Sequence, residues 1–254
     1  MKTPTELRAA IRAGEFTGPT AGHAPGYVQT NVVIVPRVDA DDFEAFCQAN
    51  AQACPLIERT APGSVRPTAA PESDIRTDIP RYRVFHHGQA AEEQPVDICH
   101  LWRDDLVTFL LGCSFTFERA LQSAGLPVRH IEEGRNVSMY RTHLPCKGAG
   151  RFSGPLVVSM RPFLPEHVPT AVEVSGRYST MHGEPIHVGD PAAIGIERLD
   201  QPDFGDPVTV REGEVPVFWA CGVTPQLALI AARCELAITH SPGCMFVTDL
   251  PEPL

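Results

Sequence analysis

Short apolar runs alternate along the chain with stretches of helical periodicity. The string TPTE at 3–6 predicts a capped helix, with threonine as the cap, proline in the first turn and glutamate closing a capping box. Apolar runs at 31–35 and 56–59 predict strands, and residues 39–50 between them predict a helix. The run at 154–160 predicts a further strand.

The remaining segments give a less regular pattern. Residues 97–125 predict two helices broken at Gly112, and residues 126–133 predict a strand. The Arg-Pro pair at 161–162 is expected to end the strand before it. Residues 213–249 predict a closing unit of strand, helix and strand.

This alternation predicts an α/β fold, a mixed-sheet sandwich with a second, smaller α+β lobe. The main lobe is expected to comprise residues 1–134 and about 230–254, and the smaller lobe residues from about 135 to 229. The alternative is a single compact unit, because 254 residues suit one large domain as well as two small lobes.

Composition narrows the range of partners and compartments. The net charge of −10 argues against a nucleic-acid partner, which usually requires a basic surface. The chain has no apolar run of transmembrane length and no signal peptide is visible, so we expect a cytoplasmic protein without a membrane partner. Eight cysteines without CxxC spacing are typical of reduced, packed thiols. A homo-oligomer is compatible with these properties but is not required by them.

The string GCSF places Cys113 between a predicted helix end and the next helix start. A thiol at a helix N-terminus would have a lowered pKa and could act as a nucleophile with a histidine as base. The alternative is a buried cysteine at a tight break, with Gly112 chosen for backbone fit and Ser114 as a cap. We favour this second interpretation, because cysteine is so often merely buried.

The string HGEPIHVGD brings His182, His187 and Asp190 close together in sequence. Such a set could hold a metal if the loop folded back on itself. The spacing matches no defined metal motif, and Asp190 before proline is typical of a turn. We therefore favour turn residues, and no metal ligand is assigned; a divalent metal stays possible as a cofactor.

Two arginines, Arg141 and Arg161, follow apolar segments that predict strands. An arginine at a strand end can hold a substrate carboxylate through two hydrogen bonds. The alternative for each is a surface salt bridge, which is the commoner role of arginine.

The closing unit carries a further group of candidates. Cys221 and Gly222 end its first strand, where α/β sheets expose ligand crevices. Thr224, followed by proline, is expected to cap the helix. Glu214 precedes the first strand and His240 follows the second, and histidine has a pKa suited to acid–base catalysis. No dinucleotide fingerprint, phosphate loop, nucleophile elbow or HExxH motif is present.

Together these strings resemble one family, the bacterial hydro-lyase-like proteins grouped as the D-glutamate cyclase family. The matching strings are GHAPGYVQTN (22–31), GCSFTFE (112–118), NVSMYRT (136–142), GPLVVSMRP (154–162), HGEPIHVGDPAAIGI (182–196), PDFGD (202–206), GEVPVFWACGVTPQ (213–226) and THSPGCMFVTD (239–249). The resemblance implies a two-lobed α/β fold and conversion of D-glutamate to 5-oxo-D-proline with loss of water. It assigns no catalytic residue.

Cyclisation of glutamate suggests roles for the candidates in binding. The amine must be neutral and held close to the γ-carboxyl carbon. Arg141 or Arg161 could hold the α-carboxylate, and donors at the turn from Gly222 to Thr224 could stabilise the oxyanion. Cys113 and Cys221 are also expected among the substrate-binding residues.

Proton transfer has its own pair of candidates at each step. His240 or Glu214 could take the ammonium proton, and His182 or Asp190 could protonate the leaving oxygen. A divalent metal could replace that last acid.

Three functions therefore stay open. The first is a lyase that acts on a small amino or hydroxy acid, with D-glutamate as the expected substrate. The second is a non-catalytic protein that binds a small carboxylate. The third is amide hydrolysis by the thiol of Cys113 or Cys221.

Overall fold

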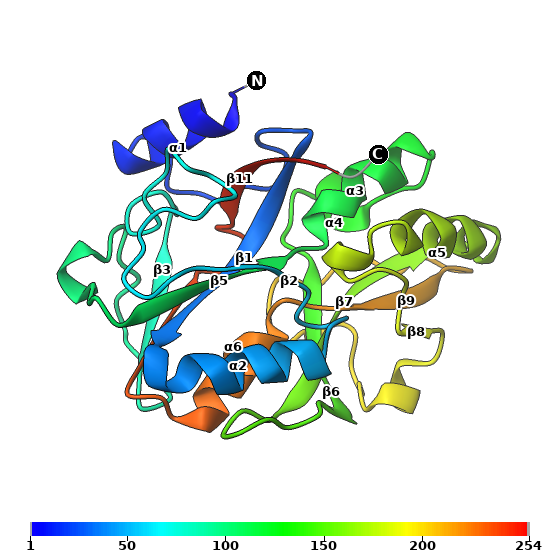
Figure 1. The fold of residues 1–254 in the computed structure, drawn as a ribbon. Coiled ribbons are helices and arrows are strands. Elements are labelled where there is room, and N and C mark those ends of the chain that lie inside the picture. Colours follow the sequence, from blue (N-terminus) through cyan, green and yellow to red (C-terminus); the bar gives the residue numbers. More distant parts are fainter. Residues whose placement is uncertain (1, 253–254) are drawn as a thin grey trace.

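Two antiparallel β-sheets organise the computed structural model, which describes residues 2–252 (Figure 1). The large sheet has the strand order β2-β5-β1-β10-β3-β4, and β11 also pairs with β1. The small sheet has the order β6-β7-β9-β8. The predicted α/β fold class is confirmed. Every strand pair described is antiparallel, so neither sheet is mixed in strand direction.

The strands of the large sheet are β1 (Tyr27–Pro36), β2 (Leu56–Arg59), β3 (Tyr82–His86), β4 (Gln89–Ala90), β5 (Leu106–Gly112), β10 (Leu236–His240) and β11 (Phe246–Pro251). Those of the small sheet are β6 (Ser138–Pro145), β7 (Pro155–Phe163), β8 (His187–Val188) and β9 (Val215–Ala220). The α-helices are α1 (Pro4–Arg12), α2 (Arg37–Ala49), α3 (Phe115–Ser123), α4 (Arg129–Glu132), α5 (Val168–Gly176) and α6 (Thr224–Ala232). Short 3-10 helices are η1 (Cys99–Leu101), η2 (Pro165–His167), η3 (Ser179–Met181) and η4 (Pro191–Ile194).

The large sheet is covered on both faces. Alternate side chains of β1 point to opposite sides, as the pleat requires. Val33 and Val35 pack with residues of α2 and α6, whereas Val32 and Ile34 pack under the long loop between β2 and β3. The central strands are therefore buried at nearly every position, with no alternation of buried and exposed residues to mark them as strands.

Two predicted elements are wrong, and a third extends further than predicted. Residues 106–112 were expected in a helix but form β5, because a short continuous apolar run fits a doubly buried strand as well as a helix. Residues 129–132, expected in a strand, form the single turn α4. The strand β7 also continues through Pro162 to Phe163, beyond the predicted end.

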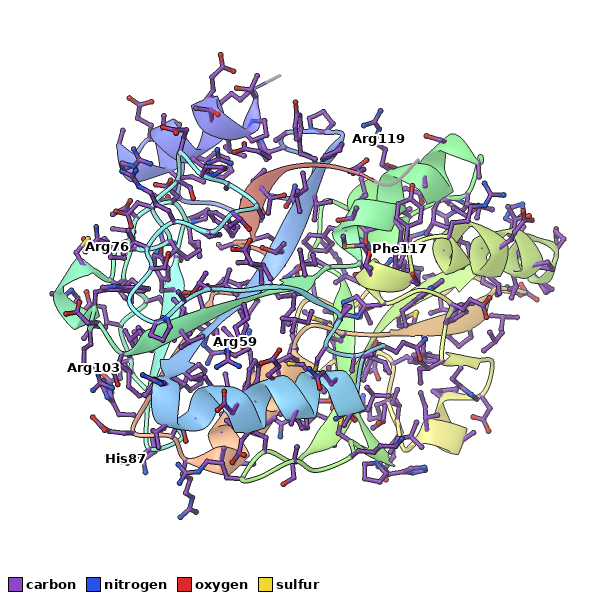
Figure 2. The ribbon with its side chains drawn as sticks, in the orientation of Figure 1. Arg59, Arg76, His87, Arg103, Phe117 and Arg119 are labelled. Atoms are coloured by element: carbon purple, nitrogen blue, oxygen red, sulfur yellow. The ribbon has the colours of Figure 1, made fainter. Side chains whose placement is uncertain are left out.

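The small sheet comes entirely from residues 138–220. Trp219 of β9 packs against Phe117 of α3 and Phe163 of β7, with ring centroids 5.8 and 6.2 Å apart. Its indole N–H donates to the Ser175 hydroxyl at 3.0 Å. Phe117 points into the interior and Arg119, on the same helix, points outward (Figure 2). Helix α3 therefore joins the two sheets, while the proposed division into two lobes stays a prediction.

The start of the chain follows the predicted pattern. Thr3 and Glu6 form the expected capping box at α1, with each side chain accepting from the other's backbone N–H. All eight cysteines carry free thiols. Among residues 2–252, no helix combines the length and apolar character that a membrane crossing requires.

Gly112 ends β5 where the strand meets η3, and it generates a stability prediction. A Cβ at this position would overlap the carbonyl oxygen of Thr180 and contact the sulfur of Met181. We expect Gly112→Ala to lower the free energy of unfolding by about 1–3 kcal/mol, the usual cost of overpacking. Urea denaturation measures the change.

Gly18→Ala is the matched control, because a Cβ there would meet no atom within 4 Å. We expect its free energy of unfolding to stay within about 0.5 kcal/mol of the parent protein. Equal stability of the two variants would contradict the close approach of β5 and η3.

Candidate active site

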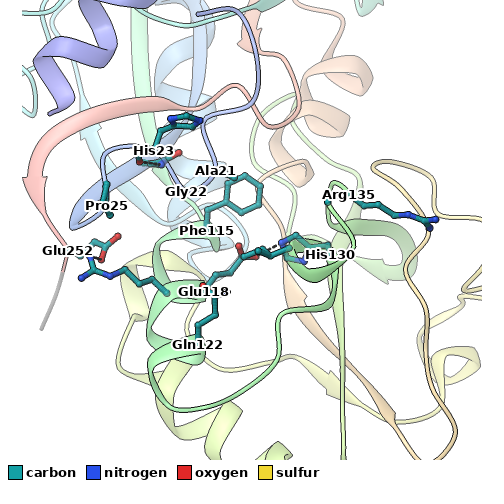
Figure 3. Close-up of a pocket in the computed structure, with 14 residues that line it drawn as sticks. Ala21, Gly22, His23, Pro25, Phe115, Glu118, Gln122, His130, Arg135 and Glu252 are labelled. Atoms are coloured by element: carbon teal, nitrogen blue, oxygen red, sulfur yellow. Dashed lines mark hydrogen bonds and ion pairs between the residues drawn. The ribbon is translucent and has the colours of Figure 1, made fainter. Parts of the chain in front are cut away.

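Two adjoining cavities lie where β5 runs into α3. The first, here called the outer cleft, has a volume of about 300 Å³. Its polar lining includes His23, Gln29, Glu118, Arg119, His130 and Glu252 (Figure 3). The second, here called the inner cavity, measures about 30 Å³ and is lined by Asn31, Cys113, Asn136, Cys221, Gly222 and His240 among others. The strings that carry the family resemblance supply all of the inner-cavity lining and fewer than half of the residues that line the outer cleft.

A buried ion pair stands behind the outer cleft. Arg161 of β7 is 0 % exposed and directs its Nε and Nη2 at Oε1 of Glu118 on α3, with an Nε–Oε1 distance of 3.1 Å. The guanidinium also donates to the hydroxyls of Ser159 and Ser114, each at 3.1 Å. Because the guanidinium already has four protein contacts, it is a fixed internal charge rather than a free anion-binding group.

Aromatic rings enclose this guanidinium on two sides. Its central carbon lies 5.4 Å from the ring centroids of both Phe117 and Trp219. Contacts of this kind are favourable for a desolvated cation. The rings also exclude water from the Arg161–Glu118 pair.

The carboxylate of Glu118 is kept ionised by its neighbours. Burial alone would raise its pKa, but the charges of Arg161 and His130 outweigh burial and lower the pKa to about 2. His130 Nε2 lies 3.2 Å from the same oxygen, although the ring is not aligned for a hydrogen bond. Glu118 is therefore a fixed negative charge, not a base poised near neutral pH.

Two buried polar atoms beside the outer cleft make no aligned hydrogen bond to any residue within 2–252. The amide nitrogen of Gln29 donates to the carbonyls of Thr20 and His23, each at 3.0 Å, which leaves its Oε1 unpaired. His130 Nε2 is the other such atom, although it lies 3.2 Å from the Glu118 carboxylate. Unpaired buried groups cost about 1–3 kcal/mol each, so they are natural contacts for a ligand.

The rim of the outer cleft carries charges of both signs, from Arg119, Arg135 and Glu252. Arg119 has a side chain that is 59 % exposed, and its Nη1 lies 3.8 Å from Glu252 Oε2. Burial raises the pKa of Glu252, although Arg119 partly opposes this. Glu252 is thus better matched than Glu118 to accept a proton near neutral pH.

His240 lies at the inner cavity, at the end of β10. Its Nδ1 accepts from the backbone N–H of Val32 at 3.1 Å, so the proton of the neutral ring is on Nε2. Burial lowers its pKa to about 4, so the ring is neutral at pH 7. This geometry suits a hydrogen-bond donor rather than a base.

The two cysteines of the inner cavity are poor nucleophiles. Burial raises the pKa of Cys113 to about 12 and that of Cys221 to about 11, although each accepts a backbone hydrogen bond at a helix start. The favoured interpretation of Cys113 as a buried thiol is confirmed, and the alternative of a pKa lowered by the helix is wrong, because loss of water outweighs the helix dipole. Thiol-based hydrolysis loses its main support.

The turn around Gly222 is shaped by close packing. A Cβ at Gly222 would overlap the amide of Asn31, which donates to the carbonyl of Gly112 at 2.7 Å. Thr224 does not cap α6 as expected; it is the first helical residue, and its hydroxyl exchanges hydrogen bonds with the backbone of Val157 on β7 at 3.0 and 3.3 Å. Gly222 lines the inner cavity and Thr224 does not.

Four other predicted site residues lie outside both cavities. Glu214 pairs with Arg129 at 2.5 Å, and this bond lowers its pKa against the effect of burial. Arg141 is on the surface, 3.7 Å from Asp203. The structure does not bring these residues to the cleft, and catalytic roles for them stay predictions.

His182 and Asp190 are the other two. His182 is buried and its Nδ1–H donates to the carbonyl of Gln52 at 2.8 Å; burial lowers its pKa to about 4. Asp190 caps η4 by accepting from Ala192 N–H at 3.0 Å, and its carbonyl contacts His187. In the part of the chain that the structure describes, no group of three or more His, Cys, Asp or Glu side chains is arranged to hold a metal.

Sequence reasoning missed the polar residues of the outer cleft. Glu118 and Gln29 both lie inside strings quoted for the family resemblance, and this membership is the sequence feature that could have identified them as site residues. Glu118 belongs to a helix that periodicity predicts, but no pattern shows that its polar side chain faces the interior. Glu252 lies near the end of the chain and has no local motif at all.

Known proteins match this chain over nearly its full length. A family model described as D-glutamate cyclase matches residues 107–249. A protein of Rubrobacter xylanophilus is 61% identical, over 96% of this chain and 94% of its own. Proteins of Bacillus licheniformis and Stutzerimonas stutzeri are 58% and 57% identical, over 97% and 98% of this chain and 94% of each relative. All three are provisionally named hydro-lyases.

Similarity to a solved structure is much weaker. A nitrogen repressor-like protein of Methanococcus jannaschii superposes with a TM-score of 0.39 and 9% identity, over 96% of this chain and 98% of that chain. A superposition of this quality supports no conclusion about fold or function.

The Arg161–Glu118 pair generates a prediction about stability and pH. Glu118→Gln leaves a buried guanidinium without its counter-charge, so we expect a loss of about 3–5 kcal/mol in the free energy of unfolding at pH 7. The folded pKa of about 2 lies below the ordinary 4.5. The stability that the carboxylate contributes is therefore present above pH 4.5 and disappears as the pH falls towards 2. Urea denaturation across this pH range should show the difference in free energy of unfolding between the parent protein and Glu118→Gln becoming smaller as the pH falls.

Glu173→Gln is the control for this experiment. Its pairing with Arg177 is at the surface, so removing it should cost less than about 1 kcal/mol. If the loss in Glu118→Gln matched this control, or stayed constant down to pH 2, the ion pair would not have the stated role.

The raised cysteine pKa values generate a labelling prediction. At pH 7.5 iodoacetamide should modify the exposed Cys99 and leave Cys113 and Cys221 intact in the folded protein, since thiolates are the reactive form. Peptide mass spectrometry identifies the modified residues. Rapid modification of Cys113 or Cys221 with parallel loss of turnover would revive the thiol mechanism.

Proposed function

Because the chain belongs to the D-glutamate cyclase family, we propose that it is a hydro-lyase that converts D-glutamate to 5-oxo-D-proline and water in the outer cleft. The family match and the names of the relatives support the carbon–oxygen lyase class. The observation that carries the assignment to this site is a cleft of about 300 Å³ that combines charges of both signs with unpaired buried polar atoms.

The charges of the cleft complement a zwitterionic diacid. Arg119 is an exposed cation at the rim and can hold the α-carboxylate. Glu252 and the unpaired Oε1 of Gln29 are the acceptors available to the ammonium group. His130 can meet the γ-carboxyl group, since its Nε2 lacks an aligned partner.

The reaction needs a neutral amine close to the γ-carboxyl carbon. Glu252, whose pKa is raised, takes one proton from the ammonium group. The nitrogen then attacks the γ-carbon, forming the C–N bond, and the C–O bond to one carboxyl oxygen breaks. The two protons that the nitrogen loses leave with that oxygen as water. Holding the extended diacid in the folded attack geometry supplies much of the rate.

Arg161 and Glu118 have a supporting role in this scheme. Arg161 is fully buried and already bonded, so it is not the residue that holds the substrate. Glu118 is a fixed negative charge beside His130, with its Oε1 3.2 Å from Nε2 of that ring. The pair thus positions the wall of the cleft against which the γ-carboxyl group reacts.

The proposal predicts distinct kinetic effects for the two rim residues. Glu252→Gln should lower kcat by about 10²-fold or more, because it removes the proton acceptor. Arg119→Ala should mainly raise KM for D-glutamate, because it removes a binding contact. Chiral chromatography of 5-oxo-D-proline measures both constants.

Arg177→Ala is the control, since this exposed arginine pairs with Glu173 and does not line the outer cleft. It should leave both constants unchanged. Lack of D-glutamate turnover by the parent protein would contradict the substrate. Binding of D-glutamate without turnover would favour a binding protein, and turnover of a small hydroxy acid instead would favour another hydro-lyase reaction.

A further inference from the structure

Phe115 is the single residue common to the linings of the outer cleft and the inner cavity. In Figure 3 its ring lies between the Ala21–Gly22 turn and His130. The ring stacks on that of His130, with centroids 6.5 Å apart and planes inclined by 28°. The two spaces therefore adjoin at this aromatic side chain.

The inner cavity has a mainly apolar lining with a few polar side chains, and it is too small for a substrate. Its volume of about 30 Å³ accommodates one or two water molecules. The ring of His240 is fixed through Nδ1, and its Nε2–H makes no hydrogen bond to a residue within 2–252. Asn136 accepts from the backbone of Val137 through Oδ1, which leaves its Nδ2 to donate. These two donors would suit a carboxylate if one could reach them.

We propose that Phe115 sets the longest diacid that the protein accepts, by closing the outer cleft off from the inner cavity. A five-carbon diacid such as glutamate ends at the ring. A six- or seven-carbon diacid places its distal carboxylate where the ring stands, and it fits only when the ring is removed. This inference rests on the proposed function, since it assumes that the outer cleft binds a diacid.

Phe115 can be shortened without removing a polar contact. It is the first residue of α3 and is only partly buried, against an apolar cluster that includes Val137, Met139 and Cys221. Alanine is a good helix former, so the helix start should persist. Phe204 packs against the same cluster, is also partly buried, and lines neither cavity. It is therefore a matched control.

Calorimetry with glutarate, adipate and pimelate tests the proposal. The parent protein should bind glutarate more tightly than the two longer diacids. Phe115→Ala should bind pimelate at least tenfold more tightly than the parent protein does, and Phe204→Ala should keep the parental order. Circular dichroism and Tm check that both variants are folded.

The outcome can be separated from that of the cyclase proposal, because these diacids lack an amine and cannot cyclise. If the parent protein bound all three diacids equally well, Phe115 would not be a limit on length. An unchanged order in Phe115→Ala, or no binding of any diacid to either protein, would also overturn the inference. A shifted order together with no formation of 5-oxo-D-proline would contradict the cyclase proposal and support the role of Phe115.

Discussion

The ion pair between Arg161 and Glu118 is the constraint on which the rest of the site depends. One partner comes from β7 of the small sheet, and the other from α3, which follows directly from β5 of the large sheet. Burying two charges is unfavourable unless each is paired and hydrogen-bonded. Two serine hydroxyls and two aromatic rings complete the surroundings of the guanidinium. The start of α3 is therefore held in one position relative to both sheets.

That position determines where the cavities lie. Ser114 binds Arg161, and the next residue, Phe115, contacts both cavities. Glu118, one turn further along the helix, faces the outer cleft beside His130. The negative charge of Glu118 is thus buried and permanent, while the exposed Arg119 and Glu252, whose pKa burial raises, lie at the rim. The fixed charges shape the cleft, and the rim charges are left to bind a ligand and move a proton.

Much of the fold could be predicted from sequence, because it depends on local signals. The capping box at Thr3 and Glu6 and the strand at 56–59 follow from residue type and spacing. The strand β5 could not be recognised, because burial on both faces removes the alternation that identifies a strand. Thr224 looked like a cap, yet its hydroxyl is used by a neighbouring strand that no local pattern reveals.

The site was harder to predict for the same reason. His240, Cys113, Cys221 and Gly222 were expected together, and they do line one cavity. Arg161 was expected to hold a substrate, but its partner is Glu118, and such a pairing depends on contacts between residues 43 positions apart. The candidate His182 donates to the carbonyl of Gln52, and the candidate Glu214 accepts from Arg129. Tertiary partners, rather than motifs, decide which polar groups remain free.

A crystal structure of the protein with 5-oxo-D-proline tests the central claim most directly. The account predicts the lactam in the outer cleft, with its carboxylate at Arg119 and its lactam carbonyl oxygen towards His130, beside the ring of Phe115. Binding elsewhere, such as at the surface pocket around Arg141 and Arg198, would contradict the account, as would an empty outer cleft at saturating product.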